Sequence, residues 1–349
     1  MWFLFTLFTT CAWGTADLFY KKGADENDRY SHLRTAIAVG IVMGIHAVYT
    51  LISKDISYDF RNLYIYLPVS AMYILSMVIG YLGLRYLELS ISSPIQNSSG
   101  AICAILCLLL LGETMSTVSA IAVIMISIGL FLLGLLEKLD ADKLAAINEK
   151  KYRIGFVAII LPLIYCIIDS LGTFFDAYYL DDFQTSPLVG ITEDTFEDVA
   201  NTSYEFTFLI CAVILSVFLL IKKFSGSKSA VSQSINATNA GDTNSNLANA
   251  GAKKDTGVNA GGKVFALSKP APATISRFLA AIFETAGQAT YVYALSANPA
   301  VAAPVISSYS IVSLILSRIF LREKLSKFHY LAIAIVIAGV AILGFLDEM

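Results

Sequence analysis

Charged residues are scarce in this sequence. They make up 15% of the 349 residues, whereas a soluble domain carries about 25%. Hydrophobic residues make up 56%, and the mean hydropathy is +0.69. One soluble core could not bury so much apolar surface. The composition therefore excludes an ordinary soluble protein and favours an all-α integral membrane protein.

Several signals of other protein classes are absent. The net charge is −3, so no basic surface indicates a nucleic-acid partner. No GxxxxGK[ST] motif occurs, so ATP is not the visible energy source, and we expect no cofactor. All five cysteines lie in apolar runs, which argues against a disulfide framework. Cys103 and Cys107 share a helical face, but two thiols alone make a poor metal site, so we expect packing roles and no metal ion.

Apolar runs of about 20 residues recur along the chain, and that length crosses about 30 Å of hydrocarbon. We expect ten transmembrane helices, at residues 2–20, 33–52, 63–84, 91–111, 117–136, 154–178, 204–221, 273–295, 299–320 and 327–346. The first run lacks a basic segment before it and a small-residue cleavage site after it. We therefore expect a retained span rather than a signal peptide.

The distribution of basic residues gives an orientation. With ten spans, all of the 24 Lys and Arg residues except Lys54 and Arg61 fall on one side of the membrane. Cytoplasmic loops carry the Lys and Arg excess. The sequence therefore predicts a multi-pass protein of the cell membrane with both termini extracytoplasmic.

Two stretches repeat each other at a constant offset of 210 positions, without a gap. The matched pairs are Tyr81 and Tyr291, Pro94 and Pro304, Ser98 and Ser308, Glu113 and Glu323, Gly129 and Gly339, and Gly134 and Gly344. The duplicated unit holds five spans, an odd number, so the second copy must be inverted. Two inverted five-helix repeats place a substrate site near the midplane and allow alternating access.

The expected domain organisation follows from this duplication. Residues 1–136 form the first five-helix repeat, and residues 137–153 form a cytoplasmic connector. Residues 154–346 form the second repeat, which is interrupted twice. An acidic external loop covers residues 180–203, and a linker rich in Ser, Asn, Ala, Gly and Lys covers residues 223–271. We expect this linker to be disordered, because it is too polar to bury a core.

Ionisable side chains inside hydrocarbon are costly and indicate transport pathways or ion pairs. Glu284 falls near the middle of the eighth predicted span, and Asp169 lies within the sixth. Asp17 lies near the cytoplasmic end of the first, and Asp176 near the outer end of the sixth. Each has a structural alternative. Asp17 can pair with a neighbouring lysine, Asp176 can lie at the membrane interface, and Glu284 and Asp169 can find partners on other spans.

Polar and aromatic residues accompany three of these acids at helical spacing. The groups are Glu284 with Gln288 and Tyr291, Asp17 with Trp13 and Tyr20, and Asp169 with Tyr165. We predict a cavity where the carboxylates bind protons or a cationic group and the rings add cation–π contacts. Asn97 is expected to line it, although it could instead serve helix packing. Pro94 and Pro304 are candidate hinges.

Several motifs resemble the repeat of the EamA-type transporters in the drug/metabolite transporter superfamily. They are Leu84-Arg85-Tyr86-Leu87, Pro94 and Leu110-Leu111-Gly112-Glu113 in the first copy, Tyr293, Pro304 and Arg322-Glu323-Lys324-Leu325 in the second, and Trp13-Gly14 with Asp17. The resemblance implies a ten-helix inverted-repeat carrier, often an exporter of amino acids or related metabolites. The second copy departs from the pattern at Leu295, which stands in place of an arginine.

The function we expect is secondary active transport of a small metabolite such as an amino acid or amine, with proton coupling. Its partners are then the substrate and the lipid bilayer, and the chain is a monomer or a homodimer. One alternative is a non-transporting membrane scaffold or sensor. Another is an intramembrane aspartyl protease using Asp17 and Asp169, but the Tyr-Asp and Gly-x-Gly-Asp motifs typical of that class are absent. We therefore expect no enzymatic activity.

Overall fold

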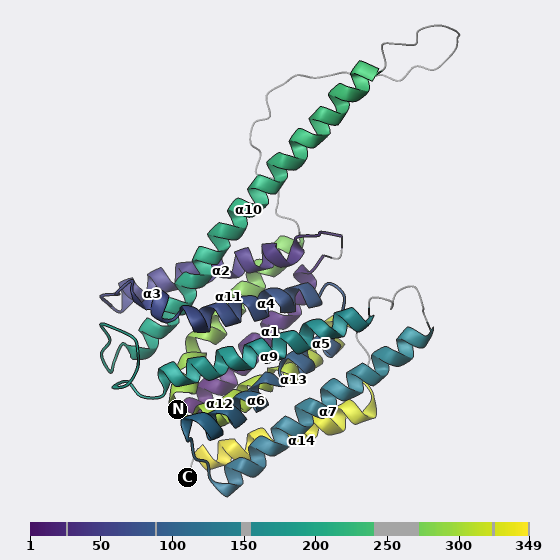
Figure 1. Cartoon of the computed structure of the whole chain (residues 1–349). Coiled ribbons are helices and arrows are strands. Elements are labelled where there is room, and N and C mark those ends of the chain that lie inside the picture. The colour runs from purple at the N-terminus through teal and green to yellow at the C-terminus, as the bar shows by residue number, and fades with distance from the viewer. Residues whose placement is uncertain (26, 88, 148–154, 241–271, 323–324, 348–349) are drawn as a thin grey trace. The chain divides into compact units, whose positions relative to one another are not determined.

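The computed structural model describes all residues except 26, 88, 148–154, 241–271, 323–324 and 348–349. Within the described residues every regular element is a helix (Figure 1). The chain forms two compact units. One unit comprises Met1–Val213 and Pro272–Met349, and the other comprises Ile214–Ala271.

The helices follow the apolar runs of the sequence, because a backbone in hydrocarbon must satisfy its hydrogen bonds within its own segment. The first half contains α1 (Trp2–Gly23), α2 (Ser31–Ser53), α3 (Asn62–Ile65), α4 (Leu67–Gly83), α5 (Leu89–Gln96), α6 (Ser99–Leu106), the π-helical turn η1 (Cys107–Leu111) and α7 (Thr117–Ile147). The second half contains α9 (Gly155–Leu180), α10 (Phe196–Ala240), α11 (Pro272–Ala297), α12 (Pro299–Ser307), α13 (Tyr309–Leu316), the π-helical turn η2 (Ser317–Leu321) and α14 (Lys327–Asp347).

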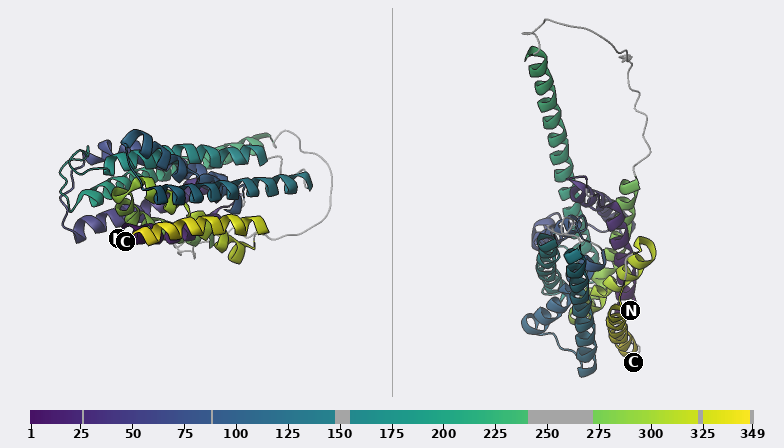
Figure 2. Two further views of the ribbon diagram at one scale, coloured as in Figure 1. Left: turned by 90° about the horizontal axis from the view of Figure 1, so that it is seen from below. Right: turned by 90° about the vertical axis from the view of Figure 1, so that its right-hand side faces the viewer.

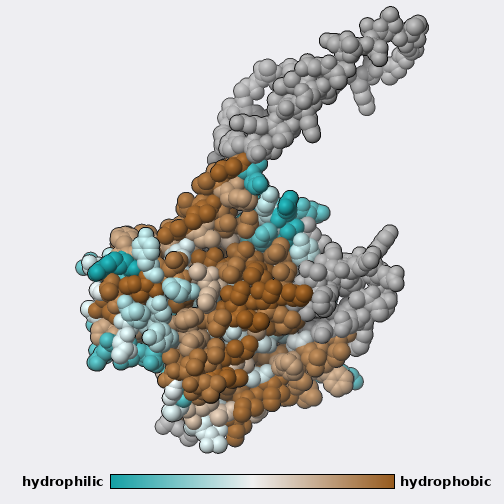
Figure 3. All heavy atoms as spheres, viewed as in Figure 1, coloured by the Kyte–Doolittle hydropathy of each residue, from teal (hydrophilic) through white to brown (hydrophobic). Residues whose placement is uncertain are grey.

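Seven helical segments in the described residues are long and apolar enough to cross a membrane. A further apolar helix, α4, is shorter, at 17 residues. The helices α1 and α11 have 22 and 26 residues but are less apolar than the seven. On the face seen in Figure 3, hydrophobic side chains cover the middle of the helices and hydrophilic ones gather towards the edges. The chain is thus a multi-pass membrane protein, whereas the count of ten spans stays a prediction.

Several connections and chain ends of the first unit gather at one end of its helices. This end holds the start of α1, the end of α14 and the loop between α9 and α10. Figure 1 and the left view of Figure 2 both show this. Asn62 fastens this loop: its side chain donates to the Val189 carbonyl and accepts from the Val189 amide, each at 2.9 Å.

A polar contact joins α2, α10 and α11 at this end. Lys54 Nζ lies 2.7 Å from an Asp198 carboxylate oxygen, and the Tyr293 hydroxyl donates to the same carboxylate at 2.6 Å. Burial alone would lower the pKa of the Lys54 ammonium. Its hydrogen bonds to Asp198 and Tyr293 outweigh burial, so its pKa is raised. The contact therefore favours the charged form of Lys54 in the folded state.

The backbone repeats itself at the offset found in the sequence. Helices α6 and α13 span equivalent residues, and each continues into a five-residue π-helical turn, η1 or η2. Both turns end in a left-handed residue, Gly112 with φ 70° and Arg322 with φ 60°. The two copies therefore share an irregular backbone as well as scattered identical residues.

Helices α7 and α14 pack against each other through reciprocal contacts. A Cβ atom on Gly129 would lie 2.3 Å from Val336 Cγ2 and 3.1 Å from the Ala332 carbonyl oxygen. In return, a Cβ atom on Gly339 would lie 2.8 Å from both Ile126 Cγ1 and the Ala122 carbonyl oxygen. These partners are also separated by 210 positions. A two-fold relation between the copies would produce this pattern, and the glycines serve close packing within the chain.

Three predicted boundaries differ from the structure. Helix α7 continues to Ile147, into the predicted connector 137–153. Helix α10 begins at Phe196, so the acidic loop is shorter than 180–203. Its first turn contains Glu197 and Asp198, and acidic side chains there interact favourably with the helix dipole.

Helix α10 also extends to Ala240, into the predicted linker 223–271. Residues 227–240 contain neither Pro nor Gly, so a helix already started can propagate through them. The rest of that linker, 241–271, lies outside the described residues.

Candidate functional site

A cavity lies in the first unit among helices from both copies. It is lined from α1, α4, α5, α6, α9, α10, α11, α12 and α13. The volume in which the centre of a water molecule can lie is about 60 Å³, enough for a few waters, since one needs about 10–15 Å³. All eight predicted binding residues line this cavity: Trp13, Asp17, Asn97, Tyr165, Asp169, Glu284, Gln288 and Tyr291. The candidate hinges Pro94 and Pro304 are not among its lining residues.

Glu284 on α11 is held by contacts from α1, which packs directly against α11. Its side chain is buried and accepts a hydrogen bond from the Tyr20 hydroxyl at 3.3 Å. Trp13 Nε1 donates to the Glu284 backbone carbonyl at 3.2 Å. The indole can approach because Gly287 has no side chain: a Cβ atom there would lie 2.4 Å from Trp13 Cδ1. The glycine thus fixes the distance between the two helices at the level of the carboxyl group.

Asp17 is held by two serines from different helices. Ser93 on α5 and Ser313 on α13 each donate to Asp17 Oδ2 at 2.7 Å. The neighbouring Lys21 donates instead to the backbone carbonyls of Leu84 and Leu87, at 2.9 and 2.5 Å. The carboxylate of Asp17 therefore joins α1 to one helix from each predicted repeat.

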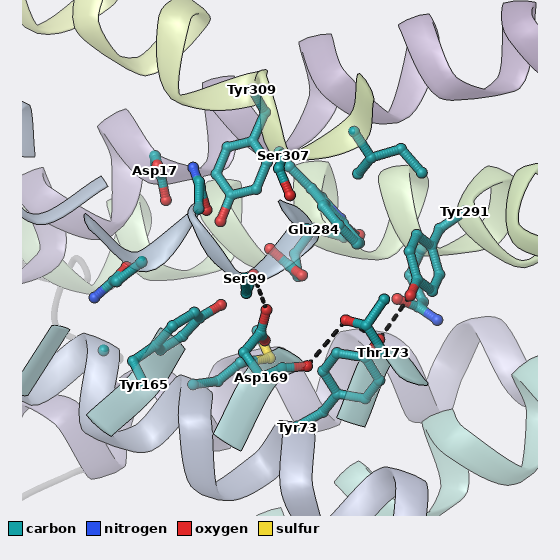
Figure 4. A pocket seen from close by; sticks show the side chains of 18 of the residues that line it. Asp17, Tyr73, Ser99, Tyr165, Asp169, Thr173, Glu284, Tyr291, Ser307 and Tyr309 are labelled. Atoms are coloured by element: carbon teal, nitrogen blue, oxygen red, sulfur yellow. Dashed lines mark hydrogen bonds between the residues drawn. The ribbon is translucent and has the colours of Figure 1, made fainter. Parts of the chain in front are cut away.

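Asp169 has a similar environment on α9. Ser99 on α6 donates to Oδ2 at 2.8 Å, and Ser76 on α4 donates to Oδ1 at 3.2 Å. Figure 4 shows the Asp169 carboxyl group directed towards Ser99, with Tyr165 to one side and Glu284 above them in this view. Asp17 and Asp169 are thus each held by serine hydroxyls from two different helices.

A chain of hydroxyl groups continues along one wall. The Tyr291 and Tyr73 hydroxyls lie 2.6 Å apart, and Tyr73 donates to Thr173 Oγ1 at 3.0 Å (Figure 4). Gln288, one turn from Glu284, is buried, and its Nε2 has no hydrogen-bond partner among the described residues. A buried amide donor without a partner is costly. Gln288 therefore offers a hydrogen bond to a molecule in the cavity.

The described lining residues have carboxyl groups but no basic side chain. Asp17, Asp169 and Glu284 supply the acids, and neither Lys nor Arg lines the cavity within the described chain. Arg85 lies elsewhere, where its guanidinium donates to the backbone carbonyls of Asp25 and Arg29. Groups of three or more His, Cys, Asp or Glu side chains that could hold a metal ion are absent from the described residues.

Comparison with known families decides the class of protein. The sequence profile of the EamA-like transporter family matches residues 1–135 and 261–345, well over half of the chain. The chain belongs to the EamA-like transporter family. This finding confirms the resemblance noted in the sequence and identifies a transporter of the drug/metabolite type.

Solved structures support the same fold for this EamA-like transporter. Among 25 matching chains, one titled "Crystal structure of protein" is 11% identical, with a TM-score of 0.56. The match covers 99% of this chain and 96% of that chain. At this level of identity the match shows the fold alone. A comparison with curated protein sequences gives no match.

Sequence reasoning missed part of the aromatic wall of this EamA-like transporter. Helical spacing groups Tyr20 with Asp17, and Tyr20 lines the cavity; the rings that were missed are Tyr73, Tyr81, Tyr204 and Tyr309. One signal was available on α4, where Tyr73, Met77, Gly80 and Leu84 recur at helical spacing and all line the cavity. Asp176, the fourth acid singled out, is fully buried and accepts a hydrogen bond from the Tyr66 hydroxyl. It is not among the lining residues.

Proposed function

We propose that this EamA-like transporter is a secondary active carrier that exports a small amine or amino acid by alternating access, with proton coupling at the cavity carboxyl groups. The observation that carries the proposal is a buried cavity with three carboxyl groups and no basic residue among its described lining residues. The cavity also lies where two inverted repeats would meet, which is the usual place for a carrier's substrate site.

The chemistry of the cavity favours a cation or a proton. An ionised carboxylate loses its hydration when buried, and it needs a compensating positive charge or a proton. An ammonium group supplies that charge, and the tyrosine and tryptophan rings add cation–π attraction. A proton supplies the same compensation. Substrate and proton therefore compete for the same carboxyl groups, so that binding of one releases the other.

The acidic wall also bears on which substrates are excluded. Sugar phosphates and nucleotide sugars need basic side chains to bind their phosphates, and the described lining has none. An amino acid carries a carboxylate as well as an ammonium group. The Gln288 Nε2 atom, which has no partner among the described residues, and the hydroxyl groups of the tyrosines are suitable donors for it.

The protease alternative gains no support from the geometry. An aspartyl protease needs two carboxyl groups that share one proton. Asp17 and Asp169 are instead held by separate pairs of serines. The scaffold alternative leaves the three acids inside the cavity without a role.

The proposed location is the cell membrane, with both termini extracytoplasmic. Two observations support this orientation. Lys and Arg are concentrated on one side of the predicted spans. In addition, α1 begins and α14 ends at the same end of the first unit (Figure 1).

Glu284→Gln tests the proposal, because it keeps the shape of the side chain and removes the titrating group. Purified protein in liposomes is assayed for counterflow of labelled amino acids and amines, and for their accumulation under an imposed pH gradient. The variant should keep exchange and lose proton-driven accumulation. Glu113→Gln is the matched control, since Glu113 does not line the cavity, and it should behave as wild type.

Two results would contradict the proposal at different points. Proton-driven accumulation by Glu284→Gln at the wild-type rate would show that this carboxyl group is not the coupling site. Failure of the wild-type protein to move any amine or amino acid would refute the substrate class and leave the carrier architecture standing.

A further inference from the structure

A second hollow lies away from the central cavity, between the end of the ninth predicted span and α14. It is an open groove of about 580 Å³. Its apolar lining residues include Ile315, Ile319 and Ile333, and its basic lining residues are Arg318 and Arg322. Ile315 and Ile319 are exposed, as side chains that face lipid are. The groove thus combines an apolar surface with two positive charges.

The local backbone brings both arginines into the same groove. Arg318 lies within the π-helical turn η2, and Arg322 follows directly after it in a left-handed conformation with φ 60°. Residues without glycine's freedom are strained in this conformation. Strain at a non-glycine residue is a recognised marker of function when the surrounding structure maintains it. The strain here lies on a residue that lines the groove.

The first copy provides an internal comparison. Its π-helical turn η1 has the same length and also ends in a left-handed residue. At the two equivalent positions it has Leu108 and Gly112 in place of the arginines. The backbone geometry therefore needs neither arginine, and glycine would fit it without strain. The charges belong to the second copy alone, at the end where the sequence places the Lys and Arg excess.

We propose that this groove binds an anionic phospholipid. The phosphate contacts Arg318 and Arg322, and an acyl chain lies along Ile315, Ile319 and Ile333. Guanidinium groups bind phosphate through paired hydrogen bonds. Basic pockets between transmembrane helices on the cytoplasmic side bind anionic head groups, and the groove lies at the end predicted to be cytoplasmic. This site is independent of the substrate cavity.

The test titrates full-length protein in zwitterionic phosphatidylcholine micelles with phosphatidylglycerol and follows thermal unfolding. The unfolding midpoint of the wild type should rise with phosphatidylglycerol and saturate. Each arginine near an anionic head group contributes about fivefold in binding. The variant Arg318→Gln with Arg322→Gln should therefore bind roughly 25-fold more weakly. Lys327→Gln removes a basic residue at the same end that does not line the groove, and should keep the wild-type response.

Arg322→Gly separates lipid binding from structural stability. It relieves the left-handed strain, so it should raise the unfolding midpoint in phosphatidylcholine alone while weakening the response to phosphatidylglycerol. A merely structural role for Arg322 would lower the midpoint in both lipids. An undiminished phosphatidylglycerol response in the double variant would overturn the proposal. So would an equal response to inorganic phosphate, which would indicate a site for soluble anions.

Discussion

The packing of α7 against α14 leads to a sharp prediction about Gly129. Replacing it by alanine adds one methyl group, which would lie 2.3 Å from Val336 Cγ2. Non-bonded carbon atoms pack at about 3.5–4.0 Å, so the two groups must separate by more than about 1 Å. Valine is restricted to one rotamer in a helix, and the Ala332 carbonyl at 3.1 Å limits movement in that direction. We therefore expect the helices to be forced apart.

Two opposing terms set the size of the effect. Alanine is favoured over glycine inside a helix by about 1 kcal/mol. Overpacking a close interface costs about 1–3 kcal/mol. Gly134→Ala on the same helix isolates the first term, because its Cβ atom would lie 3.4 Å from Ile95 Cγ1, an ordinary contact. Gly129→Ala should thus be less stable than Gly134→Ala by about 1–3 kcal/mol.

The assay is thermal unfolding of the purified protein in detergent, followed by tryptophan fluorescence. About 1 kcal/mol moves the midpoint by roughly 2–4 °C in domains of about 150–250 residues, so the two variants should be resolved. Adding Gly339→Ala to Gly129→Ala should cost less than the sum of the single changes, because one separation of the helices accommodates both methyl groups.

A midpoint for Gly129→Ala equal to or above that of Gly134→Ala would refute the reasoning. The oligomeric state, measured alongside by size-exclusion chromatography, tests whether these glycines instead pack against a second copy of the chain. If Gly129→Ala abolished a dimer without lowering the unfolding midpoint, Gly129 would pack between two copies of the chain rather than within one.

Two further predictions concern the end where α1 begins and α14 ends. Asn62→Ala removes both hydrogen bonds to Val189, at about 0.5–1.5 kcal/mol each, so limited proteolysis should cut the loop 181–195 faster; an unchanged cleavage rate would show that the loop is held by other contacts. Lys54→Gln should lower the free energy of unfolding at pH 7 by at most about 1 kcal/mol, because the Lys54 side chain is half exposed. Because the folded-state pKa of Lys54 is raised from 10.5, its contact with Asp198 stabilises the fold below that pH and loses this effect as the pH rises through the raised pKa. The difference between wild type and variant should therefore shrink in alkaline buffer, and a constant difference up to pH 12 would contradict an ionic origin.

Much of the cavity could be predicted from sequence, because each acid inside an apolar helix stands out from its surroundings. Helical spacing then linked Glu284 to Gln288 and Asp169 to Tyr165, and all four line the cavity. The other rings were missed for a physical reason. A tyrosine such as Tyr204 in an apolar helix looks the same in sequence whether it packs in a core or faces a cavity.

The boundaries and irregular turns were harder to predict. Glu197 and Asp198 suggested a solvated loop by composition, yet they stabilise the first turn of α10. The π-helical turns depend on packing between helices, and the hydrophobic periodicity of Cys107–Leu111 does not differ from that of an ordinary helix. Arg322 gave no signal of a left-handed residue, since only its counterpart, Gly112, is of the usual type.

The difference between the two copies bears on the energetics of a transport cycle. In a carrier made of two identical inverted halves, the inward-open and outward-open states would be related by a two-fold rotation and would have equal free energy. Here Ser313 donates to Asp17, whereas its counterpart Cys103 contacts Cys107 instead. In the first copy the corresponding helix holds a carboxylate from another position, since Ser99, one turn before Cys103, donates to Asp169. The two carboxylates are thus held from non-equivalent positions of equivalent helices. If the copies are inverted, the inward-open and outward-open states of the empty protein therefore differ in free energy. Such unmatched bonds determine which of the two states is more populated.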